Sequence, residues 1–183
     1  MIARSRFRIS MVMVSTAVLL GAMSAVVGSA LSIRTAAAAD GDPPSVVEDF
    51  AYPQAAQILA QYKVRLISGD GGILFADCAT PPTGDIGLIN VYSTGRIGVD
   101  GLGQVCFKVT EPSGHVEMEL PDVYEIVGDG QRAGTGHKTT ALVRTDAGQL
   151  PPVTVNPSGS TQVGIGGDEG NPPATLLQLV VTP

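Results

Sequence analysis

One stretch of the sequence, HVEMELPDVYEIV at residues 115–127, decides the fold. Polar and apolar side chains alternate through its first half, and this period of two is that of a β-strand with one face in the core. We therefore expect a strand at Val116–Leu120, with its even-numbered side chains buried, and a second strand at Val123–Val127.

Short apolar runs of the same kind occur on both sides of this stretch, and Gly, Pro, Asp or Asn separates nearly all of them. The apolar residues are mostly Val, Ile and Leu, which favour pleated sheets. Many short strands at such spacing predict a mainly β protein, an antiparallel β-sandwich or open barrel. The other expected strands are Val64–Ser68, Ile73–Cys78, Ile86–Tyr92, Val105–Thr110, Thr139–Arg144, Val153–Val155, Gln162–Ile165 and Leu176–Val181.

Two glycine-rich segments connect expected strands. Gly69-Asp70-Gly71-Gly72 separates the first two runs, and its residues tolerate the backbone angles of tight turns. We therefore expect these two runs to form a β-hairpin. Ser158–Pro173 is rich in glycine and is expected to be a flexible loop before the last strand.

One short helix is expected before the first strand. Pro53 suits a first helical position, and Ala55, Ile58, Leu59 and Tyr62 follow it at the spacing of one helical face. Such an apolar stripe indicates that the helix covers one edge or end of a sheet.

The N-terminal region has the features of a secretory signal peptide. Three arginines within the first eight residues precede a long apolar run, and Ala37-Ala38-Ala39 offers small residues for cleavage before Asp40. We predict a signal peptide at residues 1–39 and a secreted protein.

An N-terminal membrane anchor is the alternative localisation, since Met11–Ile33 has the length that a membrane-spanning helix needs. Serine, threonine and glycine dilute that run, which favours cleavage. After cleavage we expect a mobile linker at residues 40–46, a single β-rich domain at residues 47–183, and no membrane association.

The net charge excludes some partners. Without residues 1–39 the chain keeps all seventeen acidic residues and seven of its eleven basic ones, which gives a net charge of −10. A strongly acidic surface repels phosphate groups, so we expect no binding to nucleic acid or to anionic membrane surfaces.

Cys78 and Cys106 are the only cysteines. An even number of cysteines in an exported protein predicts a disulfide, here between a residue that ends one strand and a residue within another. A two-cysteine metal site is the alternative.

His115, Glu117 and Glu119 are the sharpest candidates for chemistry. At alternate positions of a strand they project from the same face, where an imidazole and two carboxylates bind a divalent metal or divide the roles of acid and base. The alternative is a polar strand face in contact with solvent.

We expect no cofactor, with structural Ca²⁺ as the alternative. Acidic turns at Asp70, Asp100, Asp129 and Asp168-Glu169 supply oxygen ligands for Ca²⁺ if their loops converge. No segment has the spacing of a calcium-binding loop, and Asp-Gly is also a common turn pair.

Several short segments between residues 48 and 127 carry a resemblance to a known group of proteins. They are Glu48–Pro53, Gly69–Gly71, Ala76–Cys78, Cys106–Phe107 and Leu120–Pro121. In these segments the chain resembles small secreted proteins of filamentous actinobacteria. The resemblance implies secretion and a β domain with paired cysteines, without implying any catalytic residue.

Export, strand-rich patterning and the lack of a catalytic motif favour a secreted, non-enzymatic β-sandwich module that binds an extracellular protein or a component of the cell envelope. Two alternatives remain open. An inhibitor of secreted proteases would present Thr80-Pro81-Pro82-Thr83, where two prolines reduce the entropy lost on docking. A hydrolase would use His115, Glu117 and Glu119.

Overall fold

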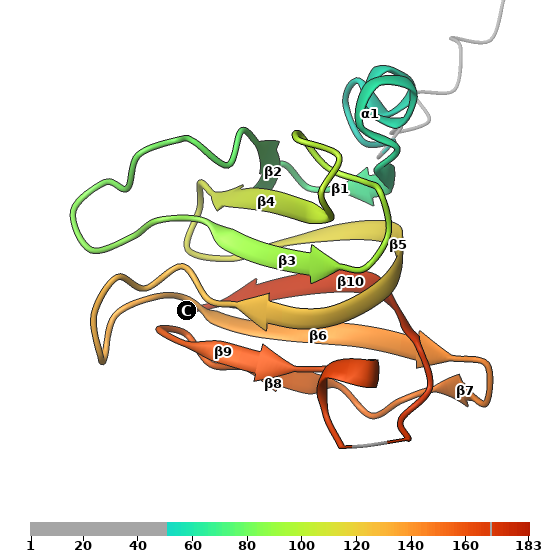
Figure 1. Cartoon of the computed structure of the whole chain (residues 1–183). Helices are drawn as coiled ribbons and strands as arrows, with labels where there is room; N and C mark the ends of the chain where they lie inside the picture. Colours follow the sequence, from blue (N-terminus) through green and yellow to red (C-terminus); the bar gives the residue numbers. More distant parts are fainter. Residues whose placement is uncertain (1–50, 169) are drawn as a thin grey trace, which may run out of the picture. The chain divides into compact units, whose positions relative to one another are not determined.

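The structure, a computed structural model, describes residues 51–168 and 170–183. Within them the chain forms one short α-helix, one 3₁₀ turn and ten strands that are joined by antiparallel pairing (Figure 1). This confirms a mainly β, antiparallel fold with one short helix. The elements are α1 (Ala55–Tyr62), β1 (Arg65–Gly69), β2 (Ile73–Ala76), β3 (Ile89–Ser93), β4 (Gln104–Val109), β5 (Gly114–Val127), β6 (Lys138–Thr145), β7 (Gly148–Gln149), β8 (Val153–Val155), β9 (Ser160–Gln162), η1 (Gly164–Gly166) and β10 (Ala174–Thr182).

Strand β5 belongs to both layers of the fold. Its first half pairs with β1 on one side and with β10 on the other, and its second half pairs with β3 and β9. From β3 the sheet continues through β4 to β2, and from β10 it continues to β6, which pairs with β7 and β8. One layer contains β3 and β4 and the other contains β10 and β6. In Figure 1 the first layer lies above the second, and β5 curves from one to the other.

The expectation of two separate strands within residues 115–127 is wrong, because β5 is continuous. The chain bends at Pro121 and Asp122, where the Asp122 φ angle is 55° and the pairing register shifts. Ser93 in β3 holds the bend, since its hydroxyl donates a hydrogen bond of 2.7 Å to the Pro121 carbonyl. Irregular pairing of this kind accommodates a proline inside a strand.

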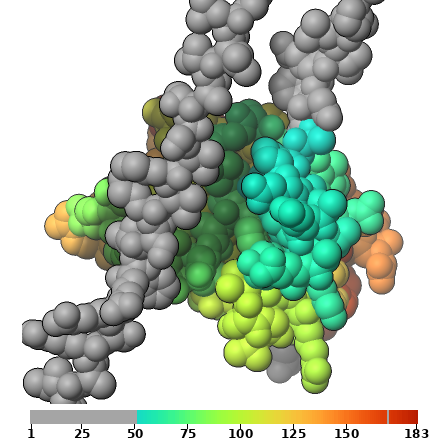
Figure 2. Space-filling view, turned by 90° about the horizontal axis from the view of Figure 1, so that it is seen from above, coloured from blue at the N-terminus to red at the C-terminus, as the bar shows by residue number. Residues whose placement is uncertain are grey.

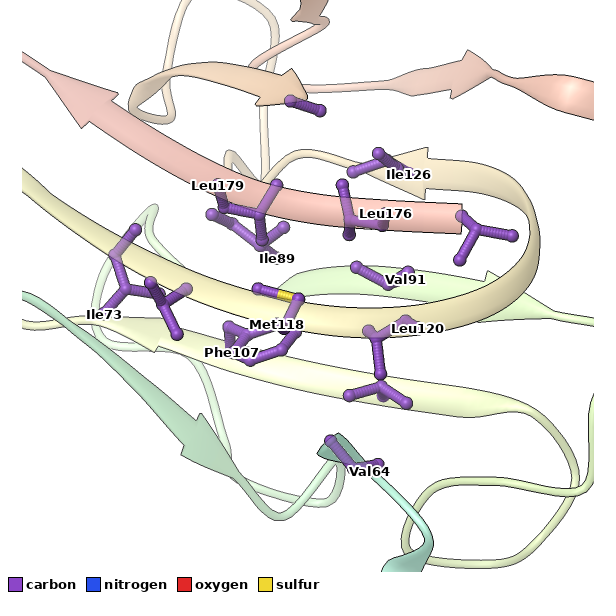
Figure 3. Packing of buried hydrophobic residues seen from close by; sticks show 14 of the residues in the cluster. Val64, Ile73, Ile89, Val91, Phe107, Met118, Leu120, Ile126, Leu176 and Leu179 are labelled. Carbon is purple, nitrogen blue, oxygen red and sulfur yellow. The ribbon is translucent and has the colours of Figure 1, made fainter. Parts of the chain in front are cut away.

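The core lies between the layers and is mostly aliphatic. Burial alternates along the first half of β5 as expected, with Val116, Met118 and Leu120 each at most 1% exposed. Phe107 of β4 and Leu179 of β10 are fully buried in the same cluster (Figure 3). Side chains from both layers thus share one apolar interior.

The expected hairpin between the first two strands is wrong. β1 pairs with β5, whereas β2 pairs with β4, so the Gly69–Gly72 turn carries the chain from one layer to the other. Asp70 fixes this turn, because its carboxylate accepts hydrogen bonds from the backbone N–H groups of Gly72 and His115. A Cβ at Gly72 would lie 2.6 Å from the Ser113 carbonyl oxygen, so the crossing needs glycine there.

Helix α1 occupies the expected segment, although it begins at Ala55 and not at Pro53. Ile58 is buried and Tyr62 is partly buried against the core, but Leu59 is 45% exposed, so the apolar stripe is narrower than expected. The helix contacts β1, one of the outer strands, as its amphipathic pattern predicts.

The disulfide between Cys78 and Cys106 is confirmed, with an S–S distance of 2.07 Å. Cys106 lies in β4 and Cys78 follows β2, whose Ala76 pairs with Cys106. The bridge therefore fastens β2, an outer strand, to its neighbour.

The segment at Ser158–Pro173 is not a plain loop. It contains β9, which pairs with the second half of β5, and the 3₁₀ turn η1, which also contacts β5. Because a Cβ at Gly166 would lie 2.0 Å from the Tyr124 carbonyl oxygen, its glycines permit close packing of this segment on β5.

The expected signal peptide and linker, residues 1–39 and 40–46, lie outside the described residues. In the part of the chain that is described, no helix has the length and apolar character needed to cross a membrane.

Candidate functional site: a groove between helix α1 and the outer strand β2

A groove of about 810 Å³ lies between α1 and β2, and we call it the α1–β2 groove. Figure 2 looks onto this side of the molecule, with the helix in cyan. The groove is lined by aromatic and aliphatic side chains at its base and by amides along the helix, including Tyr52, Tyr62, Leu74, Phe75, Gln57 and Gln61.

Two left-handed backbone positions place α1 beside the strands. Tyr52 precedes the helix and is tied to β1 by a hydrogen bond of 3.0 Å from its N–H to the Ile67 carbonyl. The chain then turns at Gln54, with φ 59°, to start the helix, and turns again at Lys63, with φ 56°, to leave it. At the start of the helix the bond to Ile67 fixes it to β1, and at its end the Tyr62 carbonyl accepts a hydrogen bond of 2.9 Å from the Gly98 N–H.

The base of the groove is an aromatic cluster continuous with the core. The rings of Tyr62 and Phe75 lie 5.2 Å apart, and Phe75 meets the buried Phe107 ring edge-on at 6.4 Å. These rings are fixed by packing, so they offer a preformed apolar surface at the floor of the groove. Leu74 adds a side chain that is 37% exposed.

The free edge of β2 forms one wall. Among the described residues β2 pairs along one side only, with β4. The Phe75 N–H points away from β4 and donates a hydrogen bond of 2.6 Å to the Tyr52 hydroxyl. Tyr52 is 6% exposed, and this burial raises the pKa of its phenol above the ordinary value, although the bond from Phe75 acts in the opposite direction.

The helix wall and the end of the groove are polar. Gln57 and Gln61 are exposed and lie one turn apart on α1, so their amides follow the same side of the helix. Asp77 is the one charged side chain among the described residues that line the groove. Its Oδ1 atom accepts a hydrogen bond of 2.9 Å from the Ala79 N–H. The groove thus combines an apolar floor with amides and a single negative charge.

The structure places His115, Glu117 and Glu119 on one face of β5, but each has its own partner. His115 lies with its Nδ1 atom 3.0 Å from the Asp70 carboxylate, and Glu117 accepts a hydrogen bond of 2.7 Å from the Ser68 hydroxyl. Glu119 is paired with two arginines, Arg65 of β1 and Arg144 of β6, at 3.4 and 3.0 Å. Partners on β1, on β6 and in the Gly69–Gly72 turn account for all three side chains.

Three of the four acidic turns serve local structure, and Glu169 of the fourth, Asp168-Glu169, lies outside the described residues. Asp70 holds the crossing between layers, Asp100 caps its own turn by accepting a hydrogen bond from Leu102, and Asp129 is buried beside His137. In the described part of the chain, no group of three or more His, Cys, Asp and Glu side chains is arranged to hold a metal ion.

Partial burial acts to raise the pKa of the Asp70 carboxyl, yet the net shift is downward. The backbone N–H groups of Gly72 and His115, together with the His115 imidazole, stabilise the charged carboxylate and outweigh the desolvation. His115 therefore stabilises the Asp70 carboxylate both through its charge and through hydrogen bonding.

The pair formed by Asp129 and His137 was not expected from the sequence. Asp129 is fully buried, and its Oδ2 atom lies 2.6 Å from the His137 Nδ1 atom, while its Oδ1 atom accepts a hydrogen bond of 2.8 Å from the His137 N–H. Asp129 occurs in a Gly-Asp-Gly string that is also typical of an exposed turn. No periodicity in the sequence distinguishes this aspartate from the exposed ones.

The segment Thr80-Pro81-Pro82-Thr83 is not part of the lining of the α1–β2 groove. Both prolines are exposed, and the loop is anchored by a hydrogen bond from the Thr80 N–H to the Asp77 carbonyl and by pairing of Thr83 with Ile86. Only Ala79 separates this segment from Cys78, so the disulfide anchors the chain just before the loop and next to Asp77 of the α1–β2 groove.

Comparison with known proteins leaves the fold and this geometry as the basis for inference. No protein-family model matches the sequence, and a search of curated proteins finds no match.

Proposed function

We propose that this protein is a secreted, non-catalytic β module that binds an extracellular protein or a component of the cell envelope in the α1–β2 groove. Secretion is proposed from the N-terminal sequence and fits the Cys78–Cys106 disulfide, which persists in oxidising surroundings. The observation that carries the proposal is the groove itself. It joins a fixed aromatic floor to amide side chains that both donate and accept hydrogen bonds.

A binding role is favoured over a hydrolytic one by the partners of the polar side chains. His115, Glu117 and Glu119 each have a separate partner, and none of them lines the α1–β2 groove. A catalytic acid and base would instead have to approach one substrate atom together. The groove offers shape, apolar contact and hydrogen bonding, which are the requirements of recognition.

A matched pair of surface variants tests the proposal. Leu74→Arg places a bulky charge in the groove, and Ile165→Arg makes the same change at an aliphatic residue of similar exposure in η1. The wild-type residues are 37% and 44% exposed. The secreted, unreduced wild-type protein and both variants would be immobilised and offered purified cell-wall polymers and culture supernatant.

We expect the wild-type protein and Ile165→Arg to retain the same wall polymer or secreted protein, and Leu74→Arg to lose it. Circular dichroism and the melting temperature would show that both variants are folded. Equal retention by Leu74→Arg, or no specific retention by the wild-type protein, would count against the groove as a binding site.

A further inference from the structure

We infer that the groove takes an extended segment of a polypeptide, which adds as a strand to the free edge of β2 and places a basic side chain beside Asp77. This inference rests on the proposed function, because it names the ligand of the same groove. It follows from the hydrogen-bonding groups of β2, from the hydroxyl of Tyr52 and from the charge at the end of the groove.

The pairing register shows which backbone groups of β2 face the groove. The Thr110 N–H donates to the Gly72 carbonyl across the β2–β4 pair, so the hydrogen-bonded positions of β2 are the even-numbered ones that follow Gly72. Phe75 lies at an odd position, and its N–H and C=O therefore both point away from β4. The direction of the bond from the Phe75 N–H to Tyr52 agrees with this assignment.

The Tyr52 hydroxyl extends this edge. It accepts the hydrogen bond that the carbonyl of a neighbouring strand would otherwise accept from Phe75. A phenol also donates one hydrogen bond, and among the described residues no acceptor is found for the Tyr52 hydroxyl hydrogen. A bound backbone can therefore donate its N–H to the Phe75 carbonyl and accept the Tyr52 O–H at its own carbonyl, as in strand addition to a sheet edge.

The negative charge of Asp77 favours a basic side chain on the bound strand. Asp77 follows β2 directly and is the one charged residue among the described lining of the groove, within a chain whose expected secreted form carries a net charge of −10. A Lys or Arg side chain on the bound strand would meet this carboxylate. The Leu74 side chain, which lies three residues before Asp77 in the lining of the groove, would contact an aliphatic neighbour.

A neutral oligosaccharide is the competing ligand, since amides and aromatic rings also contact sugars. It would not need the alternation of donor and acceptor along one strand edge, nor would it need the charge of Asp77. The edge of β2 therefore favours a polypeptide, and the two ligands differ in their response to changes in the ligand backbone.

Selection from a library of short random peptides on the wild-type protein, with selection on Leu74→Arg as the control, tests the inference. We expect peptides specific to the wild-type protein that contain Lys or Arg and lack Pro. N-methylation of the one backbone nitrogen that donates to Phe75 should weaken binding by about tenfold, because one hydrogen bond is lost. This change leaves the protein itself intact, so no loss of folding confuses the result.

Tyr52→Phe and Asp77→Asn should each weaken the selected peptide as well, while Ile165→Arg should bind it as the wild-type protein does. Unchanged affinity after N-methylation at every position, or equal enrichment on Leu74→Arg, would overturn strand addition. If wall polymers or secreted proteins still distinguish Leu74→Arg from the wild-type protein when peptides do not, the groove stays a binding site and only its polypeptide ligand is refuted.

Discussion

Replacing His137 by alanine should reveal how much a buried carboxylate depends on one neighbour. Asp129 is fully buried and accepts two hydrogen bonds from His137, one from the imidazole and one from the backbone N–H. The substitution His137→Ala removes the imidazole and keeps the backbone donor. The Asp129 charge then stays in the protein interior with only the backbone one of these two hydrogen bonds.

Hydrogen bonds to charged groups contribute about 1.5–3 kcal/mol, and breaking a fully buried ion pair costs about 3–5 kcal/mol. Because the His137 side chain is 26% exposed, water partly replaces it after the substitution, and the cost belongs nearer the lower range. We expect His137→Ala to lower the free energy of unfolding by about 2–3 kcal/mol.

The molecule supplies its own control. His115 and Asp70 form a pair of the same chemistry at 3.0 Å, but both side chains are 39% exposed. Solvent screens such pairs, so His115→Ala should cost less than about 1 kcal/mol. Urea unfolding of the unreduced wild-type protein and both variants, followed by circular dichroism at neutral pH, measures the two losses. Equal losses, or a negligible loss for His137→Ala, would refute the argument from burial.

Three further predictions concern other parts of the fold. The pKa of Asp70 is lowered in the folded state, so its contribution to stability should be present above pH 3.8, its ordinary pKa, and lost as the pH falls below that value. Urea unfolding at a series of acid pH values should therefore show a smaller fall in the free energy of unfolding for Asp70→Asn than for the wild-type protein. Reducing the disulfide, whose cysteines are 28 residues apart, should lower the free energy of unfolding by roughly 3–4 kcal/mol, measured by comparing Cys78→Ser/Cys106→Ser with the oxidised protein. Gly98→Ala should prevent normal folding, because Gly98 has φ 90° and an added Cβ would lie 1.8 Å from the Gln104 carbonyl oxygen; a melting curve like that of the wild-type protein would contradict this.

The sequence predicts the strands correctly where buried and exposed residues alternate. It predicts them less well where the chain passes from one layer to the other. Val153–Val155 matches β8 in the structure, and the buried face of β5 follows from its period of two. Pro121 predicts a break between strands, whereas the Ser93 hydroxyl and shifted pairing keep β5 continuous through the bend. That hydrogen bond comes from a residue distant in sequence, which no local pattern reveals.

The candidate site was predicted only in part. The helix and the disulfide that border the α1–β2 groove follow from the sequence, but the hydrogen bond between Tyr52 and Phe75 depends on how α1 is set against β2. Similarly, Asp129 and Asp70 both lie in Gly-Asp-Gly strings, yet one is buried and the other is exposed. Tertiary packing decides between them, so turn chemistry alone did not distinguish a core residue from a surface one.

The position of β10 has a consequence for the order in which the chain acquires its structure. This strand follows all the others in sequence, yet it lies between β5 and β6 and supplies Leu176 and Leu179 to the core. Until β10 pairs with them, β5 and β6 each keep one edge unpaired. We therefore expect the native sheet to close late, through contacts between residues distant in sequence. A chain that remains incomplete until its last strand arrives can be threaded through a narrow channel before it folds.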